Sequence, residues 1–255
     1  MHSSKPSLRR ARNHLSIKLL QRKTWNYLRY IHAKTALNSL LGRYPGAIKT
    51  VLVVGCGTGL AELLLAAENP DIHFTLTDHE AASHKTDGVK RLQQKFNINN
   101  ISWSQLNILN PEPITSKYDL VYSIEVLEHI EDDQRAARNM HRLSDQFIFC
   151  LVPFAEESRN TNPTERRKAW DRNEHYVCGY SIERLIKLFP SITNIKGCYW
   201  REYGFKFRQK LTELSNEEIK EQSRSLQQEA TEDIIDEIPS LTSEAQGLWI
   251  TAKNK

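Results

Sequence analysis

The sequence predicts an α/β fold with a Rossmann-like, doubly wound and mostly parallel sheet. Short apolar runs alternate with helical patterns through the middle of the chain, as in consecutive βαβ units. The run 51–54 stops at Gly55, Gly57 and Gly59, and a helical pattern follows. Glycines at such a turn let the backbone bend sharply and approach a ligand at the helix N-terminus. The turn therefore predicts a cradle for a nucleotide-type ligand.

The order of elements follows from apolar periodicity and from stop signals. One or two helices are expected over residues 8–42, ahead of the sheet. Strands are expected at 50–54, 72–77, 101–105, 118–123 and 146–152, with helices at 59–67, 86–96 and from about 124 to 143. A capped helix starts at Ser181, and 192–199 and 248–252 are expected to pair as strands.

Four segments divide the chain by role. Residues 1–46 are expected to form an N-terminal helical cap and 47–255 the main domain. The stretch 154–175 is polar, contains Pro163 and follows a strand end, so we expect a loop that acts as a lid over a site. Residues 205–240 are expected to form a charged helical insertion.

Composition indicates a single α/β domain with additions, since 255 residues can bury a full core. Hydrophobic residues make up 39% and charged residues 26%, which is ordinary for a globular chain. The longest apolar runs are too short for a bilayer, and the N-terminus does not resemble a signal peptide. Four scattered cysteines without a CxxC pair indicate a reduced, cytoplasmic enzyme without structural zinc. We expect a monomer or homodimer with no membrane partner.

Charge is distributed unevenly along the chain. No acidic residue precedes Glu62, whereas residues 213–237 are rich in Asp and Glu. A basic N-terminal helix can bind nucleic acid or another polyanion, or it can pack near the acidic C-terminal helix or face solvent. The aromatic residues Trp25, Tyr27 and Tyr30 favour the packing interpretation, because they suit a core or a lid better than a stacking platform.

Asp78 closes the second expected strand. A carboxylate there can accept both hydroxyls of a ribose seated on the glycine turn. NAD and other adenosine cofactors both satisfy this geometry. The GxGxG spacing lacks the third glycine of the pyrophosphate fingerprint GxGxxG, and no later segment offers a nicotinamide site.

With these motifs the chain resembles class I S-adenosylmethionine-dependent methyltransferases from about residue 50 to 200. The resemblance rests on VLVVGCGTGL, the acidic end of LTD, the turn 105–108 and YDLVYSIEVLEHIED. It implies a seven-stranded sheet that ends in a C-terminal antiparallel hairpin. It also implies that Asp78 holds the ribose, that Leu106 and Asn107 border the adenine, and that Glu125 lies near the transferred methyl group. The implied cofactor contacts are Gly55, Cys56, Gly57, Gly59, Asp78, His79, Asn107, Ile108 and Glu125; many family members have Asp at the position of Asn107.

The segment 125–129 reads Glu-Val-Leu-Glu-His. If a helix begins near Ile124, Glu125, Glu128 and His129 share one helical face. Two carboxylates and an imidazole can ligate a divalent ion such as Mg²⁺ or Mn²⁺. This ExxEH pattern resembles that of ubiquinone-biosynthesis O-methyltransferases and of small-RNA 2′-O-methyltransferases, which implies His175 as a further ligand. Alternatively His129 or His175 is a general base, or these side chains serve capping, packing or substrate contact.

The function expected from these residues is methyl transfer from S-adenosylmethionine to an O or N atom of a small molecule. Five lid cations indicate an anionic acceptor, or else a solvated charged loop: Arg159, Arg166, Arg167, Lys168 and Arg172. The alternatives are a metal-assisted RNA 2′-O-methyltransferase, a nicotinamide-dependent oxidoreductase, and a cofactor-binding regulatory protein without turnover.

Overall fold

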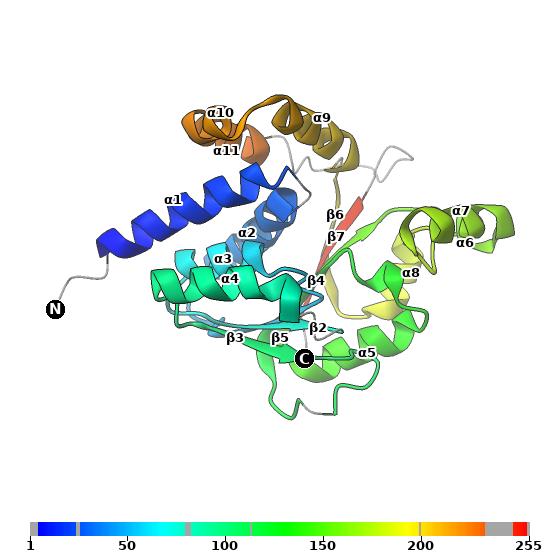
Figure 1. Cartoon of the computed structure of the whole chain (residues 1–255). Helices are drawn as coiled ribbons and strands as arrows, with labels where there is room; N and C mark the ends of the chain where they lie inside the picture. The colour runs from blue at the N-terminus through cyan, green and yellow to red at the C-terminus, as the bar shows by residue number, and fades with distance from the viewer. Residues whose placement is uncertain are drawn as a thin grey trace.

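The molecule is built around one seven-stranded sheet, seen in a computed structural model that describes residues 5–23, 26–79, 83–112, 114–198, 200–232 and 247–253. The strand order is β3-β2-β1-β4-β5-β7-β6 (Figure 1). Strands β1 to β5 pair in parallel, and β7 lies antiparallel between β5 and β6. The strands are β1 Thr50–Val54, β2 His73–Asp78, β3 Ile101–Gln105, β4 Tyr118–Ile124, β5 Ser144–Pro153, β6 Ile192–Cys198 and β7 Gly247–Lys253. The predicted Rossmann-like sheet and its antiparallel hairpin are confirmed.

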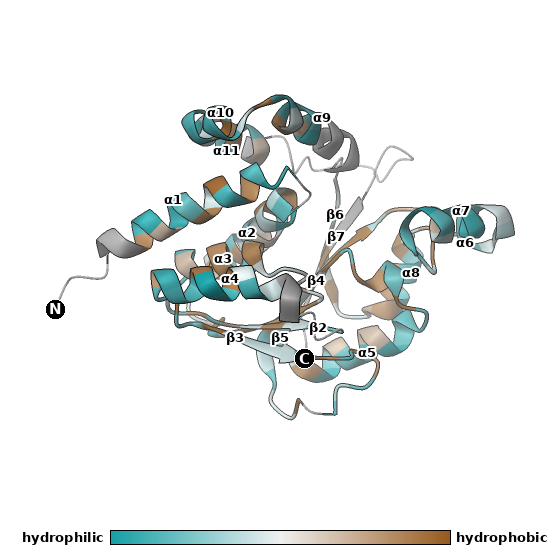
Figure 2. Cartoon of the chain, in the orientation of Figure 1, coloured by the Kyte–Doolittle hydropathy of each residue, from teal (hydrophilic) through white to brown (hydrophobic). Residues whose placement is uncertain are grey.

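Helices cover both faces of the sheet. They are α1 Lys5–Gln21, α2 Asn26–Arg43, α3 Leu60–Glu68, α4 Ser83–Phe96, α5 Asp133–Leu143, α6 Glu157–Thr161, α7 Pro163–Asn173, α8 Ile182–Leu188, α9 Trp200–Glu213, α10 Asn216–Glu221 and α11 Ser223–Glu232. In Figure 1, α1, α2 and α9–α11 lie above the sheet, α5 lies below it and α8 lies to its right. Figure 2 shows brown, apolar segments in helices next to the sheet such as α3, whereas α7 and α10 are mainly teal. Among the described helices, none is both long and apolar enough to cross a membrane.

Two apolar cores follow from the alternation of side chains along the strands. Val51 and Val53 of β1 point into the core that contains α1–α4 and α9–α11. Leu52 and Val54 point into the core that contains α5 and α8. Because β1 is buried on both faces, it reads as an unbroken apolar run in the sequence. This double burial fixes the strand end at which the glycine turn begins.

The N-terminal and C-terminal helices pack against each other, with α1 in contact with α3, α10 and α11. Lys23 donates to the backbone oxygen of Leu214 at 2.7 Å, and Gln21 donates to that of Asn216 at 3.1 Å. These contacts confirm that the basic first helix packs near the acidic C-terminal helices. Residues 233–240 of the expected insertion lie outside the described residues.

The predicted start of a helix near Ile124 is wrong. Glu125 adopts a left-handed conformation with φ of 55°, which ends the strand in a turn. A short 3₁₀ helix, Leu127–His129, follows. The α-helix begins only at Asp133, where the Asp132 side chain accepts a hydrogen bond from the Arg135 N–H and caps the helix. Glu125, Glu128 and His129 therefore do not share a helical face.

The expected lid loop at 154–175 is also wrong in its secondary structure, because most of it forms α6 and α7. Asn162 caps α7 by accepting hydrogen bonds from the N–H groups of Thr164 and Glu165. Pro163 occupies the first turn, where its missing N–H has no cost. Pro163, which we interpreted as part of a loop, lies in the first turn of a helix.

Candidate functional site

The glycine turn joins β1 to α3 and has left-handed backbone at each of its three glycines. Their φ angles are 72°, 58° and 72° at Gly55, Gly57 and Gly59. A Cβ at Gly55 would lie 2.5 Å from a methyl carbon of Val126, and one at Gly59 would overlap the Trp103 ring. A Cβ at Gly57 would meet nothing within 4 Å. Gly55 and Gly59 thus serve packing, whereas Gly57 leaves open space at the turn.

The Asp78 carboxylate lies beside this turn, as the sequence predicts. One of its oxygens accepts from the Gly57 N–H at 2.8 Å, and the other accepts from the His79 N–H at 2.8 Å. Cys56 is buried, and its N–H donates to the backbone oxygen of Thr77. These bonds tie the carboxyl ends of β1 and β2 together around the open space at Gly57.

The turn after β3 supplies the residues expected at the adenine. The Leu106 N–H donates to the Asp78 backbone oxygen, which brings this turn next to β2. Leu106 and Ile108 are buried in the core. Asn107 and the His79 side chain are exposed, and the Asn107 side-chain oxygen accepts from the Leu109 N–H. The structure thus places Leu106, Asn107 and Ile108 beside the Asp78 end of β2.

Three residues near the turn were missed in the sequence. Arg29 of α2 donates to the Gly55 backbone oxygen at 2.8 Å. Glu62 of α3 is 2% exposed and accepts a hydrogen bond from the Tyr122 hydroxyl at 3.2 Å. Burial raises the pKa of Glu62, and the positive charge of Arg29 opposes this increase. A carboxylate in the first turn of the otherwise apolar run 60–67 is the signal that could have found Glu62.

Glu125 ends β4 in the left-handed turn, and its N–H donates to the Leu151 backbone oxygen at 2.9 Å. A non-glycine residue in this region carries strain, which concentrates at functional sites. Val126 then packs over Gly55. The strained turn therefore brings the segment 125–129 directly against the glycine turn.

Glu128, His129 and His175 form a cluster whose ligand atoms all lie within 4.8 Å of one another. The two imidazole rings are perpendicular, with centroids 4.5 Å apart. Glu128 and His175 are buried and His129 lies at the exposed edge. Partial burial lowers the pKa of His129, Glu174 opposes this decrease, and Arg29 adds to it. The structure brings together three of the four predicted metal ligands; Glu125 is not part of the cluster.

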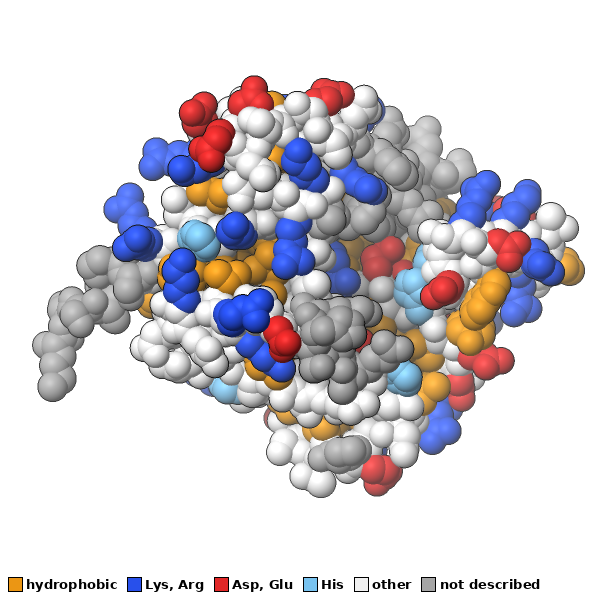
Figure 3. Space-filling model, viewed as in Figure 1, with side chains coloured by type: hydrophobic (Ala, Val, Ile, Leu, Met, Phe, Trp, Pro, Cys, Tyr) orange, Lys and Arg blue, Asp and Glu red, His pale blue; other side chains and the backbone are white. Residues whose placement is uncertain are grey.

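His175 reaches the cluster because α6 and α7 are fixed to the chain that follows them. The Asn160 side chain donates to the Gly179 backbone oxygen at 3.0 Å and accepts from the Cys178 N–H at 2.8 Å. Glu174 ends α7 with φ of 57°, and the Tyr176 N–H donates to the Glu128 backbone oxygen at 2.8 Å. In Figure 3, histidine and acidic side chains lie on the side of the α6–α7 region that faces the centre of the molecule.

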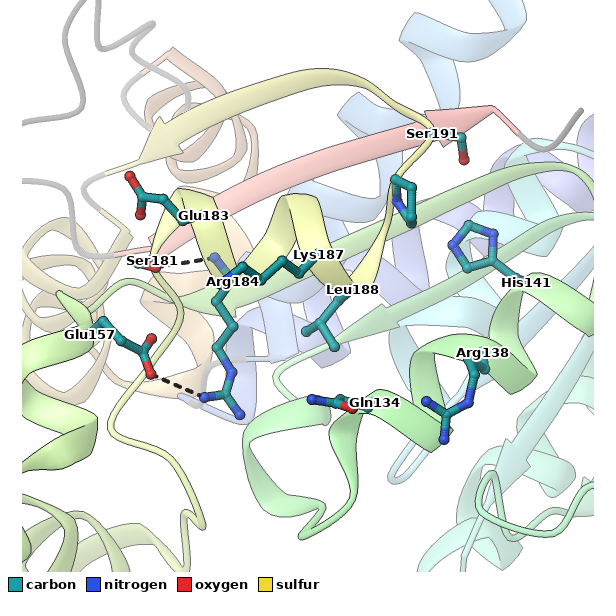
Figure 4. Close-up of a pocket in the computed structure, with 11 residues that line it drawn as sticks. Gln134, Arg138, His141, Glu157, Ser181, Glu183, Arg184, Lys187, Leu188 and Ser191 are labelled. Carbon is teal, nitrogen blue, oxygen red and sulfur yellow. Dashed lines mark hydrogen bonds and ion pairs between the residues drawn. The ribbon is translucent and has the colours of Figure 1, made fainter.

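A separate cavity of about 1160 Å³ lies between α5 and α8 (Figure 4). Its central cation, Arg184, bonds Asp133 at 2.7 Å and Glu157 at 3.4 Å. The predicted cofactor, catalytic and metal residues are not among the residues that line it. Arg184 is paired with carboxylates of α5 and α6. We therefore interpret this cavity as a junction at which ion pairs hold α5, α6 and α8 together.

The region around the glycine turn is similar to a known protein family. Residues 52–145 match a family model described as a methyltransferase domain. This match and the shared fold support an S-adenosylmethionine-dependent methyltransferase. The matched residues include the glycine turn, Asp78 and the segment 125–129, whereas His175 and the α6–α7 helices follow them.

Relatives of this chain occur in mycobacteria and cyanobacteria. Uncharacterised methyltransferases of Mycobacterium bovis and Mycobacterium tuberculosis are 28% identical over 150 residues, which cover 58% of this chain and 68% of theirs. An uncharacterised protein of a Synechococcus strain is 28% identical over 161 residues, which cover 61% of this chain but only 38% of that protein.

Solved structures share the fold of this chain at low sequence identity. A proposed sarcosine dimethylglycine methyltransferase from Galdieria sulphuraria has a TM-score of 0.61 at 12% identity, covering 88% of this chain and 85% of that one. Coclaurine N-methyltransferase, bound to N-methylheliamine and S-adenosylhomocysteine, scores 0.57 at 15% identity, covering 86% and 72%. Magnesium protoporphyrin IX methyltransferase from Synechocystis, with bound S-adenosylhomocysteine, scores 0.53 at 14% identity, covering 90% and 84%.

Proposed function

We propose that this methyltransferase transfers the methyl group to an O or N atom of a small-molecule acceptor. The observation that carries the proposal is the contact of two imidazoles, His129 and His175, beside the buried Glu128 carboxylate. This cluster follows β4 and β5, and Arg29 couples it electrostatically to the glycine turn. A proton acceptor and the expected cofactor cradle therefore lie on the same edge of the sheet.

The residues at the turn fit S-adenosylmethionine. The space at Gly57 is open to a ligand, and Asp78 stands beside it at the strand end where a ribose would be bound. When bound there, the cofactor supplies an electrophilic methyl group. Solved structures with this fold contain S-adenosylhomocysteine, which supports the same cofactor here.

The residues of the chain then position the acceptor and receive its proton. Methyl transfer is an in-line displacement, so orientation and exclusion of water supply most of the catalysis. Because its pKa is lowered, His129 is neutral at pH 7 and can accept a proton from a hydroxyl or an ammonium group. His175, Glu128 and the α6–α7 helices would hold that imidazole in place and cover the acceptor.

The same cluster supports a divalent metal as a second role. One carboxylate and two imidazoles form a donor set that suits Mn²⁺ better than Mg²⁺, which prefers oxygen ligands. A bound ion would polarise an acceptor hydroxyl. In calorimetry, Mn²⁺ should bind the wild-type chain and not His175→Gln, while the exposed His73→Gln control behaves as wild type. Equal Mn²⁺ binding by wild type and His175→Gln would remove the metal from the proposal.

The fold relatives and the packing of the first helix support a small-molecule acceptor. The solved structures include enzymes named for small molecules, coclaurine and magnesium protoporphyrin IX. The basic first helix, which together with the ExxEH motif and His175 motivated the RNA alternative, packs on α3, α10 and α11. We therefore place the small-molecule acceptor ahead of RNA.

The test is transfer of radiolabelled methyl from S-adenosylmethionine to a panel of phenols, carboxylic acids and amines. We expect wild type to label at least one acceptor and His129→Gln to lower its turnover by about 10²-fold or more, as for loss of a general base. His73→Gln is the matched control because His73 is exposed at the opposite end of β2. Cofactor binding without any transfer would instead favour the regulatory alternative.

A further inference from the structure

The α6–α7 helices contain a cleft whose lining residues all lie outside the matched region 52–145. It has a volume of about 350 Å³ and is lined by Thr161, Arg166, Trp170, His175 and Tyr176, among others. A cavity of this size is at the lower end of those that hold small ligands. Since His175 also belongs to the cluster with Glu128 and His129, the cleft opens beside the proposed reaction centre.

The apolar wall of the cleft is an exposed aromatic corner. Trp170 is 45% exposed although it is a large apolar side chain. Its ring meets that of Tyr176 nearly at right angles, 66°, with centroids 4.9 Å apart. Two aromatic rings in this arrangement can contact a planar ligand with one face and one edge. Figure 3 shows hydrophobic side chains among Lys and Arg side chains at this end of the molecule.

The cations of the lid are unequal, because three of the five form ion pairs. Arg159 and Lys168 both pair with Glu165, and Arg167 pairs with Asp171. Within the part of the chain that the structure describes, Arg166 and Arg172 make no ion pair. Of these two, Arg166 lines the cleft with Trp170. One uncompensated guanidinium beside an aromatic corner favours a ligand that is both planar and negatively charged.

The cleft is held in a fixed position relative to the cluster. Asn160 ties α6 to the backbone of Cys178 and Gly179, and the Tyr176 N–H binds the Glu128 backbone oxygen. The aromatic corner and the imidazole of His175 therefore move together with the segment that follows β4. Preorganisation of this kind lowers the cost of binding a small ligand.

We propose that this cleft is the specificity site of the methyltransferase and binds the planar, anionic part of an aromatic acid acceptor. Trp170 and Tyr176 contact the ring, and Arg166 pairs with the carboxylate. The acceptor then extends past His175 toward the glycine turn. This inference rests on the proposed function, because it assigns the acceptor class for the same site.

The test measures dissociation constants of three simple probes by saturation-transfer NMR, using the full chain saturated with S-adenosylhomocysteine. Benzoate is planar and anionic, cyclohexanecarboxylate is anionic but not planar, and benzyl alcohol is planar but neutral. We expect benzoate to bind at least about fivefold more tightly than either comparator. Trp170→Leu and Arg166→Gln should each weaken benzoate by about fivefold or more, whereas Trp170→Phe should retain most of the affinity.

The controls separate failure of this inference from failure of the proposed function. Arg142→Gln removes an exposed cation of α5, outside the cleft, and should leave benzoate binding unchanged. Loss of S-adenosylhomocysteine binding by wild type would overturn the proposed function itself. Retained S-adenosylhomocysteine binding with no preference for benzoate would overturn only the inference. Tighter binding of a short RNA than of benzoate, abolished by Trp170→Leu, would also overturn it and assign the cleft to nucleic acid.

Discussion

At the scale of single residues, the three glycines of the turn have different roles despite similar backbone angles. Gly55 and Gly59 are packed against Val126 and Trp103, and only Gly57 faces open space. An alanine at Gly57 would both strain the backbone and obstruct the cofactor. An alanine at a glycine with positive φ elsewhere would only strain the backbone, so comparing the two substitutions separates these effects. Gly46 has φ of 76°, and a Cβ there would also meet no atom within 4 Å.

We predict that Gly57→Ala and Gly46→Ala lose similar stability, about 1–2 kcal/mol each, because each places a side chain on left-handed backbone. Only Gly57→Ala should weaken S-adenosylhomocysteine, by about tenfold or more, because its Cβ enters the space beside Asp78. Urea unfolding and calorimetry measure the two effects. Equal cofactor affinity in both variants would mean that the space at Gly57 is not the cofactor site.

At the scale of elements, Asp119 joins the start of β4 to its neighbours. Its carboxylate accepts from the N–H groups of Lys49 and Thr50 at 2.8 and 2.9 Å and from Gln146 at 2.9 Å. Burial opposes ionisation, but these hydrogen bonds outweigh it and lower the pKa of Asp119. The carboxylate therefore stabilises the fold above its pKa in the unfolded chain, about 3.9.

We predict that Asp119→Asn lowers the free energy of unfolding by about 1–3 kcal/mol at neutral pH, as for loss of charged hydrogen bonds. The difference from wild type should be full above about pH 4. It should be lost as the pH falls through the lowered pKa of the folded state, where wild type is also protonated. Urea unfolding as a function of pH checks this, with the exposed Asp145→Asn as control. A difference that persists unchanged through the acid range would contradict it.

The elements that the sequence predicted best are those with a local signal. The strand 101–105 was placed correctly because its ends coincide with turn residues, and Ser181 caps α8 as expected. The α6–α7 helices were missed because Pro163, which we interpreted as part of a loop, can equally occupy the first turn of a helix. The late start of α5 was missed because the left-handed turn at Glu125 depends on Val126 packing over Gly55, a contact between distant segments.

The site was predictable to the same extent. Asp78 and Gly57 were predicted as neighbours because parallel strands align their carboxyl ends, and His175 was placed near His129 by the resemblance of the motif. Arg29 could not be found, because its position depends on how α2 docks on α3 and β1. That docking depends on the apolar core that these elements share, and no sequence pattern next to Arg29 indicates it.

At the scale of the whole molecule, the terminal helices belong to the same core as the sheet. Leu15 and Leu19 of α1 are fully buried in the cluster that also holds Val51, Val53 and Ile219. The cap and the insertion are therefore expected to unfold together with the sheet rather than as separate units.

We predict that Leu19→Ala lowers the free energy of unfolding by about 2–5 kcal/mol while unfolding stays a single transition. Circular dichroism and tryptophan fluorescence should report the same midpoint. Asn13→Ala, at an exposed position of α1, should change little. An early transition that removes the cap while S-adenosylhomocysteine still binds would show that the cap is an independent unit.

The central claim is that the glycine turn and Asp78 hold S-adenosylmethionine. Titration calorimetry with S-adenosylhomocysteine tests it most directly, using wild type, Asp78→Ala and NAD⁺ as the competing ligand. We predict that wild type binds S-adenosylhomocysteine and not NAD⁺, and that Asp78→Ala loses about tenfold or more in affinity with its circular dichroism unchanged. Binding of NAD⁺ in its place, or S-adenosylhomocysteine affinity that is unchanged in Asp78→Ala, would contradict the claim.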